Sequence, residues 1–312
     1  MLAVAALLVV AAVVVASQAS RLGGPAPSAL PADAPPSGVA LMYTRDPANP
    51  HALRAYDWSG APRGVARFPT WVPISRLRPS PDGSAFLLDP STPGDYAAYF
   101  DRVGRTLFET NDDRFLSQAW ADGGTHVCVQ SGGALVTRVP GQADRAVPSQ
   151  VGDGFNLAAC SVRADVAIFA SQDGIAIARL STGAVLRSTS VPQGGSFVAS
   201  ADAAFVAIGQ PGDEPVEIYQ TGDLSRPAAT LGSAGVPLAF SGDGSLLLAG
   251  NPGGEAPLTA LEWRTGKVVW RYGAATGDVE LVVSHQAAAE FALYIGTNAV
   301  VVRRDGTARK VA

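Results

Sequence analysis

A tight turn runs straight into an apolar stretch in Ser80-Pro81-Asp82-Gly83-Ser84-Ala85-Phe86-Leu87-Leu88, and this arrangement returns along most of the chain. In the turn, Pro presets φ at the second position, Asp suits the third and Gly tolerates the last. The turns of this first series are Ser80–Gly83, Trp120–Gly123, Ser161–Ala164, Ser200–Ala203, Ser241–Gly244 and Ser284–Ala287. Their spacing of about forty residues is typical of a repeat architecture.

A second series of turns is marked by glycine: Gly60, Gly104, Gly141, Gly183, Gly222, Gly266 and Gly306. Apolar runs lie between the turns, as in Val166-Ala167-Ile168-Phe169, and such runs suit strands that are buried on both faces. Two hairpin turns per repeat, with no long helical pattern, predict four short strands per repeat, which is the blade of a β-propeller. The predicted fold class is therefore all-β, a β-propeller of seven blades.

The first blade is predicted to be incomplete. There are seven glycine turns but six turns of the first series. The first unit opens with Val39-Ala40-Leu41-Met42-Tyr43, which matches the second strand of the other repeats. We therefore expect the innermost strand of the first blade to be missing, and the chain to enter the ring on the face that carries the turns.

The N-terminal part of the chain differs from the repeats. Met1–Ser20 has no charged side chain, and Leu2–Ala16 is an unbroken run of Leu, Val and Ala. Such a run predicts either a membrane anchor or a signal peptide, with Ser17-Gln18-Ala19 as the small-residue cleavage site. Arg21–Gly38 is a Pro/Ala-rich linker. We expect an apolar helix at 1–20, a linker at 21–38, the propeller at 39–312, and export to the cell envelope or outside, either membrane-anchored or secreted.

Two sequence motifs resemble known propeller repeats. Ser80-Pro81-Asp82-Gly83-Ser84-Ala85-Phe86-Leu87-Leu88 resembles the Ser-Pro-Asp-Gly repeat of WD-repeat and TolB-like propellers. Leu261-Glu262-Trp263-Arg264-Thr265-Gly266-Lys267-Val268-Val269-Trp270 resembles a hairpin of quinoprotein-type propellers, but it is well formed once, which argues against a bound quinone. The resemblance implies the fold and leaves the function open, because propellers serve as enzymes, adaptors and receptors alike.

Cofactor, metal and nucleic-acid binding have no support in the sequence. The net charge is −4, whereas nucleic-acid binding needs clustered positive charge. His51, His126 and His285 fall in different repeats without metal-ligand spacing. Phosphate-binding, zinc-protease, serine-hydrolase and calcium-loop motifs are all missing from the sequence. We therefore predict no cofactor and no metal, and assign no catalytic residue.

Cys128 and Cys160 are the two cysteines of the chain. Aligned with the repeats, Cys128 lies on the second strand of blade three and Cys160 on the first strand of blade four. Neighbouring blades can bring two such residues within the Cα separation of about 4.4–6.8 Å that a disulfide requires. An exported protein meets oxidising conditions, which favour the bond. The other interpretation, which we prefer from the sequence, is a pair of small buried hydrophobic residues without a bond.

Charge separates the two faces of the predicted ring. The loops after second and fourth strands share one face, and the turns after first and third strands share the other. The first face collects Asp46, Asp95, Asp112, Asp113, Asp153, Asp173, Asp213, Glu214, Glu255 and Asp278, against Arg45 and Arg114. The second collects Arg102, Arg105, Arg138, Arg145, Arg187, Arg226, Arg264, Lys267, Arg303, Arg304, Arg309 and Lys310, together with turn aspartates. Such acidic loops would suit a basic partner, a cation or a polyol.

These patterns favour an extracytoplasmic binding or interaction module, either secreted or tethered to a membrane, whose variable loops present the recognition surface. Its ligand is an unknown protein or polar molecule. The alternative is an extracytoplasmic hydrolase or lyase with carboxylates in the mouth of the central channel. An enzyme would show polar groups with perturbed pKa values converging in a pocket, whereas a binding module needs a flat or shallow face.

Overall fold

A computed structural model describes residues 30–37, 39–88, 96–111, 115–124, 126–139, 143–152, 154–171, 174–190, 195–210, 214–233, 235–250, 257–275, 279–285, 287–295 and 298–311. The chain divides into two compact units, Met1–Ala32 and Asp33–Ala312, and the description below concerns the second. The apolar helix predicted at 1–20 lies outside the described residues. No helix among the described residues is long and apolar enough to span a bilayer.

The second unit is built from short strands. They are β1 (Leu41–Asp46), β2 (Asn49–Asp57), β3 (Pro62–Arg67), β4 (Leu77–Pro79), β5 (Ala85–Leu88), β6 (Ala97–Asp101), β7 (Thr106–Thr110), β8 (Phe115–Ala121), β9 (His126–Ser131), β10 (Ala134–Arg138), β11 (Arg145–Pro148), β12 (Asn156–Ser161), β13 (Val166–Ala170) and β14 (Gly174–Arg179). They continue as β15 (Val185–Ser190), β16 (Ser196–Ala199), β17 (Phe205–Gly209), β18 (Pro215–Gln220), β19 (Ala229–Ser233), β20 (Val236–Phe240), β21 (Leu246–Gly250), β22 (Pro257–Glu262), β23 (Lys267–Ala275), β24 (Val279–Ser284), β25 (Phe291–Ile295), β26 (Asn298–Val302) and β27 (Ala308–Lys310). Helix among the described residues is limited to two single 3₁₀ turns, η1 (Ile74–Arg76) and η2 (Asp122–Gly124), so the all-β prediction is confirmed.

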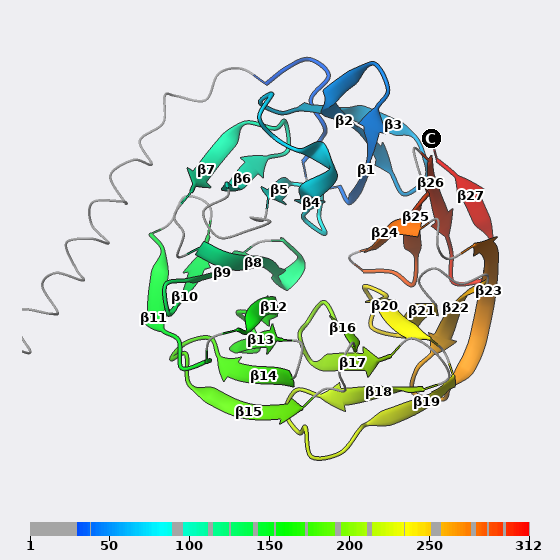
Figure 1. Cartoon of the computed structure of the whole chain (residues 1–312). Coiled ribbons are helices and arrows are strands. Elements are labelled where there is room, and N and C mark those ends of the chain that lie inside the picture. The colour runs from blue at the N-terminus through cyan, green and yellow to red at the C-terminus, as the bar shows by residue number, and fades with distance from the viewer. Residues whose placement is uncertain are drawn as a thin grey trace, which may run out of the picture. The chain divides into compact units, whose positions relative to one another are not determined.

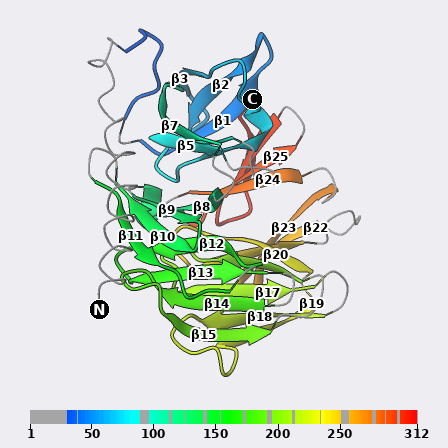
Figure 2. The ribbon, with the colours of Figure 1, turned by 60° about the vertical axis from the view of Figure 1, so that its left-hand side comes forward.

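Consecutive strands pair antiparallel into sheets. Strands β4–β7, β16–β19, β20–β23 and β24–β27 each form a four-stranded sheet, and β1–β3 form a three-stranded one. Strands β8–β11 and β12–β15 are two further meanders, which join into one eight-stranded sheet where Cys160 of β12 pairs parallel with Ala121 of β8. The sheets lie around a common centre with their first strands innermost (Figure 1), and a turned view shows the same succession from β12 outward to β15 (Figure 2).

Side chains from facing sheets form the core. One cluster joins β5 and β6 to β1–β3 through Phe86, Phe100 and Leu53. Others join each later pair of neighbouring sheets in the same way. The middle strands β13, β17 and β21 are buried almost throughout, as their unbroken apolar runs predict, because both of their faces meet a neighbouring sheet.

The first sheet lacks an innermost strand among the described residues. Leu41 of β1 packs with Phe86 of β5, and Met42 of β1 packs with Ala292 of β25. Strands β5 and β25 are both second strands of their sheets, so β1 lies at the level of a second strand. Leu41 also lies against Gly83, which places the start of β1 at the edge that carries the turns. We call this edge the turn face, and the opposite edge the loop face.

Two tyrosines occupy the contacts around β1. The Tyr43 backbone N–H donates to the Tyr294 hydroxyl at 3.1 Å, and the Tyr43 hydroxyl donates to the Gly83 carbonyl at 2.7 Å. The first bond links β1 to the last sheet and the second links it to the next one. Burial is the main cause that raises the pKa of Tyr294 to about 12, so its hydroxyl stays protonated at neutral pH. These bonds close the ring where the first sheet is short of a strand.

Replacing Tyr294 with Phe is expected to lower the free energy of unfolding by about 1 kcal/mol, because the partly buried Tyr43 N–H loses its acceptor. Urea denaturation measures the loss. Tyr219→Phe is the matched control, since that hydroxyl donates to Glu217 within the same strand and joins no two sheets. Equal unfolding midpoints for Tyr294→Phe and the unaltered protein would show that the bond does not hold the ring closed.

Three turns of the first series have the same pattern of hydrogen bonds. In the turn at Ser80, the Ser80 hydroxyl donates to Asp82 Oδ1 at 2.5 Å and accepts from the Ala85 N–H at 3.0 Å, while Asp82 Oδ1 accepts from the Ser84 N–H at 3.0 Å. Ser200 with Asp202 and Ser241 with Asp243 repeat these contacts. The Ser and Asp of the repeat therefore satisfy backbone donors of the turn, which explains why both residue types recur.

Two glycines of the second series allow the backbones of neighbouring sheets to meet. Gly104 has φ +88°, and a Cβ there would lie 2.0 Å from the Arg67 carbonyl oxygen. Gly183 has φ +69°, and a Cβ there would lie 1.9 Å from the Pro148 carbonyl oxygen. Both positions thus need a residue without a side chain that tolerates positive φ. Gly141 lies outside the described residues.

Part of the predicted linker belongs to the ring. The compact unit begins at Asp33 and not at Val39. The Asp33 carbonyl accepts from the Val65 N–H at 2.9 Å, and its carboxylate accepts two hydrogen bonds from Arg67, at 3.0 and 2.5 Å. Asp33 therefore covers part of the outer edge of β3 and satisfies the Val65 N–H there. The chain meets the outer strand of the first sheet before it enters β1 at the turn face.

Candidate binding surfaces

The predicted acidic face is described at two of its positions. Asp46 ends β1, accepts from the Ala48 N–H at 3.0 Å and pairs with Arg54 at 3.0 Å. The bond from Ala48 is the main cause that lowers the Asp46 pKa. Glu214 is exposed directly before β18, in a sheet that does not neighbour the first one (Figure 1). The structure therefore does not bring these two together. Asp95, Asp112, Asp113, Asp153, Asp173, Asp213, Glu255 and Asp278 lie outside the described residues.

Six arginines of the turn face pair with carboxylates, three within one turn and three with a carboxylate of another turn. The pairs, with their shortest N···O distances, are Arg63–Asp57 (2.5 Å), Arg105–Asp101 (2.7 Å), Arg138–Asp144 (2.7 Å), Arg179–Asp165 (3.9 Å), Arg303–Glu290 (3.8 Å) and Arg304–Asp243 (3.9 Å). Arg309 donates to the Trp58 carbonyl at 2.8 Å. Of the twelve basic residues counted on this face in the sequence, Arg105, Arg138, Arg303 and Arg304 thus have a carboxylate partner.

One turn illustrates how strongly a carboxylate is held. Asp57 accepts from the Ser59 N–H at 2.8 Å, the Ser59 hydroxyl at 2.6 Å, the Ala61 N–H at 3.0 Å and Arg63 Nε at 2.8 Å. Burial is the largest single influence on the Asp57 pKa and raises it, but the hydrogen bonds from Ser59 and Arg63 outweigh burial and bring the pKa to about 2. Asp57 is therefore a structural anion that organises its turn.

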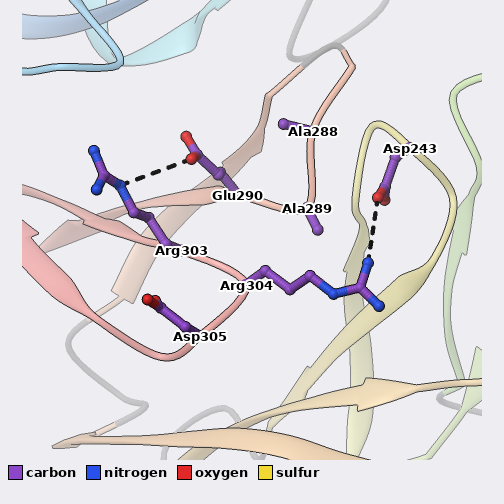
Figure 3. Close-up of a pocket in the computed structure, with 7 residues that line it drawn as sticks. All are labelled: Asp243, Ala288, Ala289, Glu290, Arg303, Arg304 and Asp305. Carbon is purple, nitrogen blue, oxygen red and sulfur yellow. Dashed lines mark ion pairs between the residues drawn. The ribbon is translucent and has the colours of Figure 1, made fainter.

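A shallow hollow of about 480 Å³ opens on the turn face between the last two sheets (Figure 3). Arg304 crosses it, with one guanidinium nitrogen 3.9 Å from Asp243 and the other 3.7 Å from Glu262. Its lining is Asp243, Ala288, Ala289, Glu290, Arg303, Arg304 and Asp305. Burial raises the Asp243 pKa, but hydrogen bonds from Ser241 and Ser245 outweigh it and lower the pKa overall. Carboxylates and guanidiniums alternate around the hollow, so its charge selects no single ligand class.

Two exposed aromatic residues were not singled out by the sequence. Trp71, between β3 and β4, is 41% exposed, and Tyr96, directly before β6, is 49% exposed. Their ring centroids lie 5.2 Å apart. Both belong to connections at the loop face, because β3 ends, β4 begins and β6 begins there. The sequence shows an aromatic residue in each of these two loops, but the spacing of the residues does not show that the two loops meet.

The centre of the ring was the predicted place for an enzyme site. Strands β4, β8, β12, β16, β20 and β24 lie innermost (Figure 1). Among their described side chains the charged one is Arg78, which donates to the Gln118 carbonyl. Within the described part of the chain, no three His, Cys, Asp or Glu side chains gather in a way that could hold a metal ion. His51, His126 and His285 lie in three different sheets or their turns.

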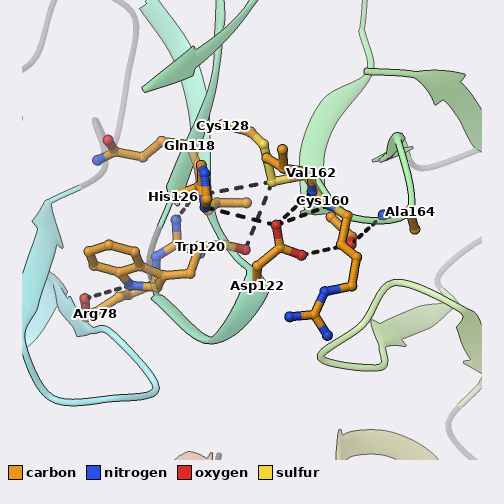
Figure 4. The surroundings of a disulfide bond; sticks show 12 residues. Arg78, Gln118, Trp120, Asp122, His126, Cys128, Cys160, Val162 and Ala164 are labelled. Carbon is orange, nitrogen blue, oxygen red and sulfur yellow. Dashed lines mark hydrogen bonds and ion pairs between the residues drawn. A yellow bond between two sulfur atoms is a disulfide. The ribbon is translucent and has the colours of Figure 1, made fainter. Parts of the chain in front are cut away.

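Cys128 and Cys160 form a disulfide, with their Cα atoms 6.5 Å apart (Figure 4). The bond joins β9 to β12, the strands expected from the repeat alignment, at the seam between the two halves of the eight-stranded sheet. Both residues are buried. Of the two alternatives open in the sequence, the structure has the bonded pair rather than two separate buried thiols.

Asp122 reaches across the same seam. Its Oδ1 accepts from the Ser161 hydroxyl at 2.8 Å, and its Oδ2 accepts from the N–H groups of Val162 and Arg163 at 3.0 and 3.2 Å (Figure 4). In the sequence, Arg163 stands where other turns of the series have Asp. The carboxylate that this turn lacks is therefore supplied by the neighbouring repeat, from a residue at φ +50°.

Comparison with known proteins shows the fold and no family. No family model matches the chain, and no curated protein matches it. Among solved structures, the crystal structure of Hsv2 from Kluyvelomyces marxianus matches with a TM-score of 0.50 and 14% identity, over 63% of this chain and 61% of that chain. Hsv2 is a β-propeller, so the predicted propeller fold is confirmed. The chain spans less than two thirds of the structure it matches.

Proposed function

We propose that the chain is an exported β-propeller of seven blades whose loop face binds a basic partner. The blade count follows from reading the eight-stranded sheet as two blades, since its halves are separate antiparallel meanders joined at Cys160 and Ala121. Added to the three-stranded sheet and the four four-stranded sheets, these two halves make seven. The similarity to the Hsv2 structure supports the propeller fold, and the number of blades is our interpretation of the sheets.

Export is supported by the disulfide and by the N-terminal sequence. Disulfides form and persist in oxidising compartments, and Cys128 and Cys160 are joined. Leu2–Ala16 has the composition of a signal peptide or anchor. Recovering the full chain from its host uncleaved, soluble in the cytoplasm and with two free thiols would contradict export.

The observation that carries the binding proposal is the unequal distribution of acidic and basic residues between the chain segments of the two faces. At the turn face, Arg63, Arg105 and Arg138 pair with carboxylates of their own turns. The loop-face segments carry Asp95, Asp112, Asp113, Asp213 and Glu214, while arginines are few there. A surface with an excess of one charge attracts a partner of the other and speeds its association. The enzyme alternative rests on Glu280 of β24, the one carboxylate in the sequence of the six innermost strands.

A defined cationic probe tests the proposal. We expect the full chain to bind hexalysine in isothermal titration calorimetry, and not hexaglutamate, with an affinity that falls as salt is added. Neutralising the loop face (D95N, D112N, D113N, D213N and E214Q together) is expected to weaken binding about tenfold or more, since steering and complementarity both depend on those charges.

The matched control neutralises exposed turn-face acids instead (D202N, D223N and D305N together) and is expected to leave the affinity nearly unchanged. An equal loss in both variants would mean that hexalysine senses net charge alone. That result, or no hexalysine binding by the unaltered protein, would overturn the proposal. Binding of neutral maltohexaose in place of hexalysine would point to a polyol ligand and would overturn it as well.

A further inference from the structure

Trp71 and Tyr96 form an outward-facing pair on the loop face. The rings are tilted by 41° with centroids 5.2 Å apart, and each residue is more than two fifths exposed. Single exposed aromatic residues are common on soluble proteins. Two large aromatic rings side by side at the surface differ from such single residues, because together they expose a contiguous apolar area to water. Trp71 and Tyr96 belong to two different connections of the chain, so the two side chains come together only in the folded propeller.

The pair is held rigidly from below. The Trp71 ring lies 6.0 Å from that of Phe100, which is fully buried in β6. The next residue, Val72, is 3% exposed, and its N–H donates to the Pro69 carbonyl at 3.0 Å. Tyr96 leads directly into β6 through the buried Ala97. Because Val72 and Ala97, which follow the two aromatic residues in the chain, are buried, a ligand that binds these rings would cost little ordering of the protein on that side.

Acidic residues adjoin the pair in the chain. Asp95 directly precedes Tyr96, and Asp89 begins the same connection between β5 and β6. Asp112 and Asp113 belong to the connection that leaves β7 at the same edge of this sheet. In the sequence, the β3–β4, β5–β6 and β7–β8 connections contain these four carboxylates and two arginines, Arg76 and Arg114. The charge complementary to this part of the loop face is positive.

We propose that Trp71 and Tyr96 form a cation-binding platform that receives a Lys or Arg side chain of a basic partner. The faces of aromatic rings carry negative potential, so a cation is attracted to them, and the attraction grows when neighbouring carboxylates add to the field. The aliphatic part of a Lys or Arg side chain can at the same time cover the exposed rings. This platform rests on the proposed function and names the contact through which the loop face would recognise its partner.

The test measures hexalysine binding to variants of the full chain by isothermal titration calorimetry. Trp71→Ala is expected to weaken binding about fivefold, and Tyr96→Ala by a similar factor, in line with cation–π attraction at an exposed site. Trp71→Phe keeps an aromatic face and is expected to restore most of the affinity. Leu107→Ala is the matched control, because Leu107 is 44% exposed on β7 of the same sheet and lies outside the pair.

The outcomes separate the platform from the function on which it rests. If hexalysine binds the Trp71→Ala and Tyr96→Ala variants as well as the unaltered protein, yet fails to bind the loop-neutralised variant, the platform is overturned and the proposed function stands. If the unaltered protein does not bind hexalysine, both fall. Maltohexaose binding that Trp71→Ala abolishes would assign the rings to a sugar and overturn the cation platform. Circular dichroism of each variant checks that the ring is folded.

Discussion

Replacing Cys128 and Cys160 together with Ala is expected to lower the free energy of unfolding by about 4 kcal/mol. The two residues lie 32 apart in sequence, and a cross-link that closes a loop of this length restricts the unfolded chain by about that amount. Their side chains are buried, so Ala keeps the seam apolar while removing the bond. Urea denaturation of the oxidised proteins at one temperature measures the difference.

Reductant provides the control for this loss. A thiol reductant should bring the unaltered protein toward the stability of the Cys128→Ala/Cys160→Ala variant and should leave the variant itself unchanged. Each single Ala variant should lose about as much as the double variant, because either change removes the whole bond. If reduction and substitution both leave the denaturation midpoint where it was, the bond does not stabilise the seam.

Asp122→Ala is expected to cost about 3 kcal/mol, the second largest effect. The substitution removes a carboxylate that accepts three hydrogen bonds from Ser161, Val162 and Arg163. Those donors belong to the next repeat, so the loss falls on the contact between two sheets. Ala is also less tolerant than Asp of the left-handed backbone at φ +50°. Thermal or urea unfolding, with the disulfide intact, measures the change.

Two variants separate the causes of that loss. Asp122→Asn tolerates the same backbone but has one acceptor oxygen in place of two, so it should lose about half as much. Asp202→Ala removes an exposed aspartate whose bonds stay within its own turn, and it should cost about 1 kcal/mol or less. A loss for Asp202→Ala as large as for Asp122→Ala would show that the contact across the seam adds nothing to an ordinary turn.

Asp122 and the disulfide stabilise the same seam, so their effects should not add. With Cys128 and Cys160 bonded, the turn at Ser161 stays beside β8 even after Asp122 is lost. In the variant without the bond, the same loss should cost more, because the hydrogen bonds are then the main polar link across the seam. Neighbouring contacts commonly show such coupling, and a double-mutant cycle measures it.

Features that depend on residues close in sequence could be predicted before the fold was known. The Ser80 and Asp82 side chains form hydrogen bonds with backbone groups within five residues, so the turn can be predicted from its local sequence. Gly104 and Gly183 have the positive φ that their place in the glycine series suggests. The strand succession, the all-β class and the short first sheet follow from the order of these turns.

Features that depend on ring closure could not be predicted. Tyr43 meets Tyr294 across 251 residues, and nothing near either residue indicates the contact. Arg304 looked like free positive charge, yet it lies beside Asp243 of another sheet. The acidic face was predicted from loop sequences, but loop sequence does not show that Trp71 and Tyr96 come together.

The sequence by itself determined the period, the turns and the succession of strands, because each rests on local backbone preferences and on hydrogen bonds that span a few residues. Only the tertiary structure decided that Cys128 is bonded to Cys160 and that Asp122 completes the turn at Ser161. It likewise decided that Asp33 covers β3. These contacts form between groups that share no local sequence pattern, and they exist only once packing of the apolar sheet faces has set the distance between neighbouring repeats.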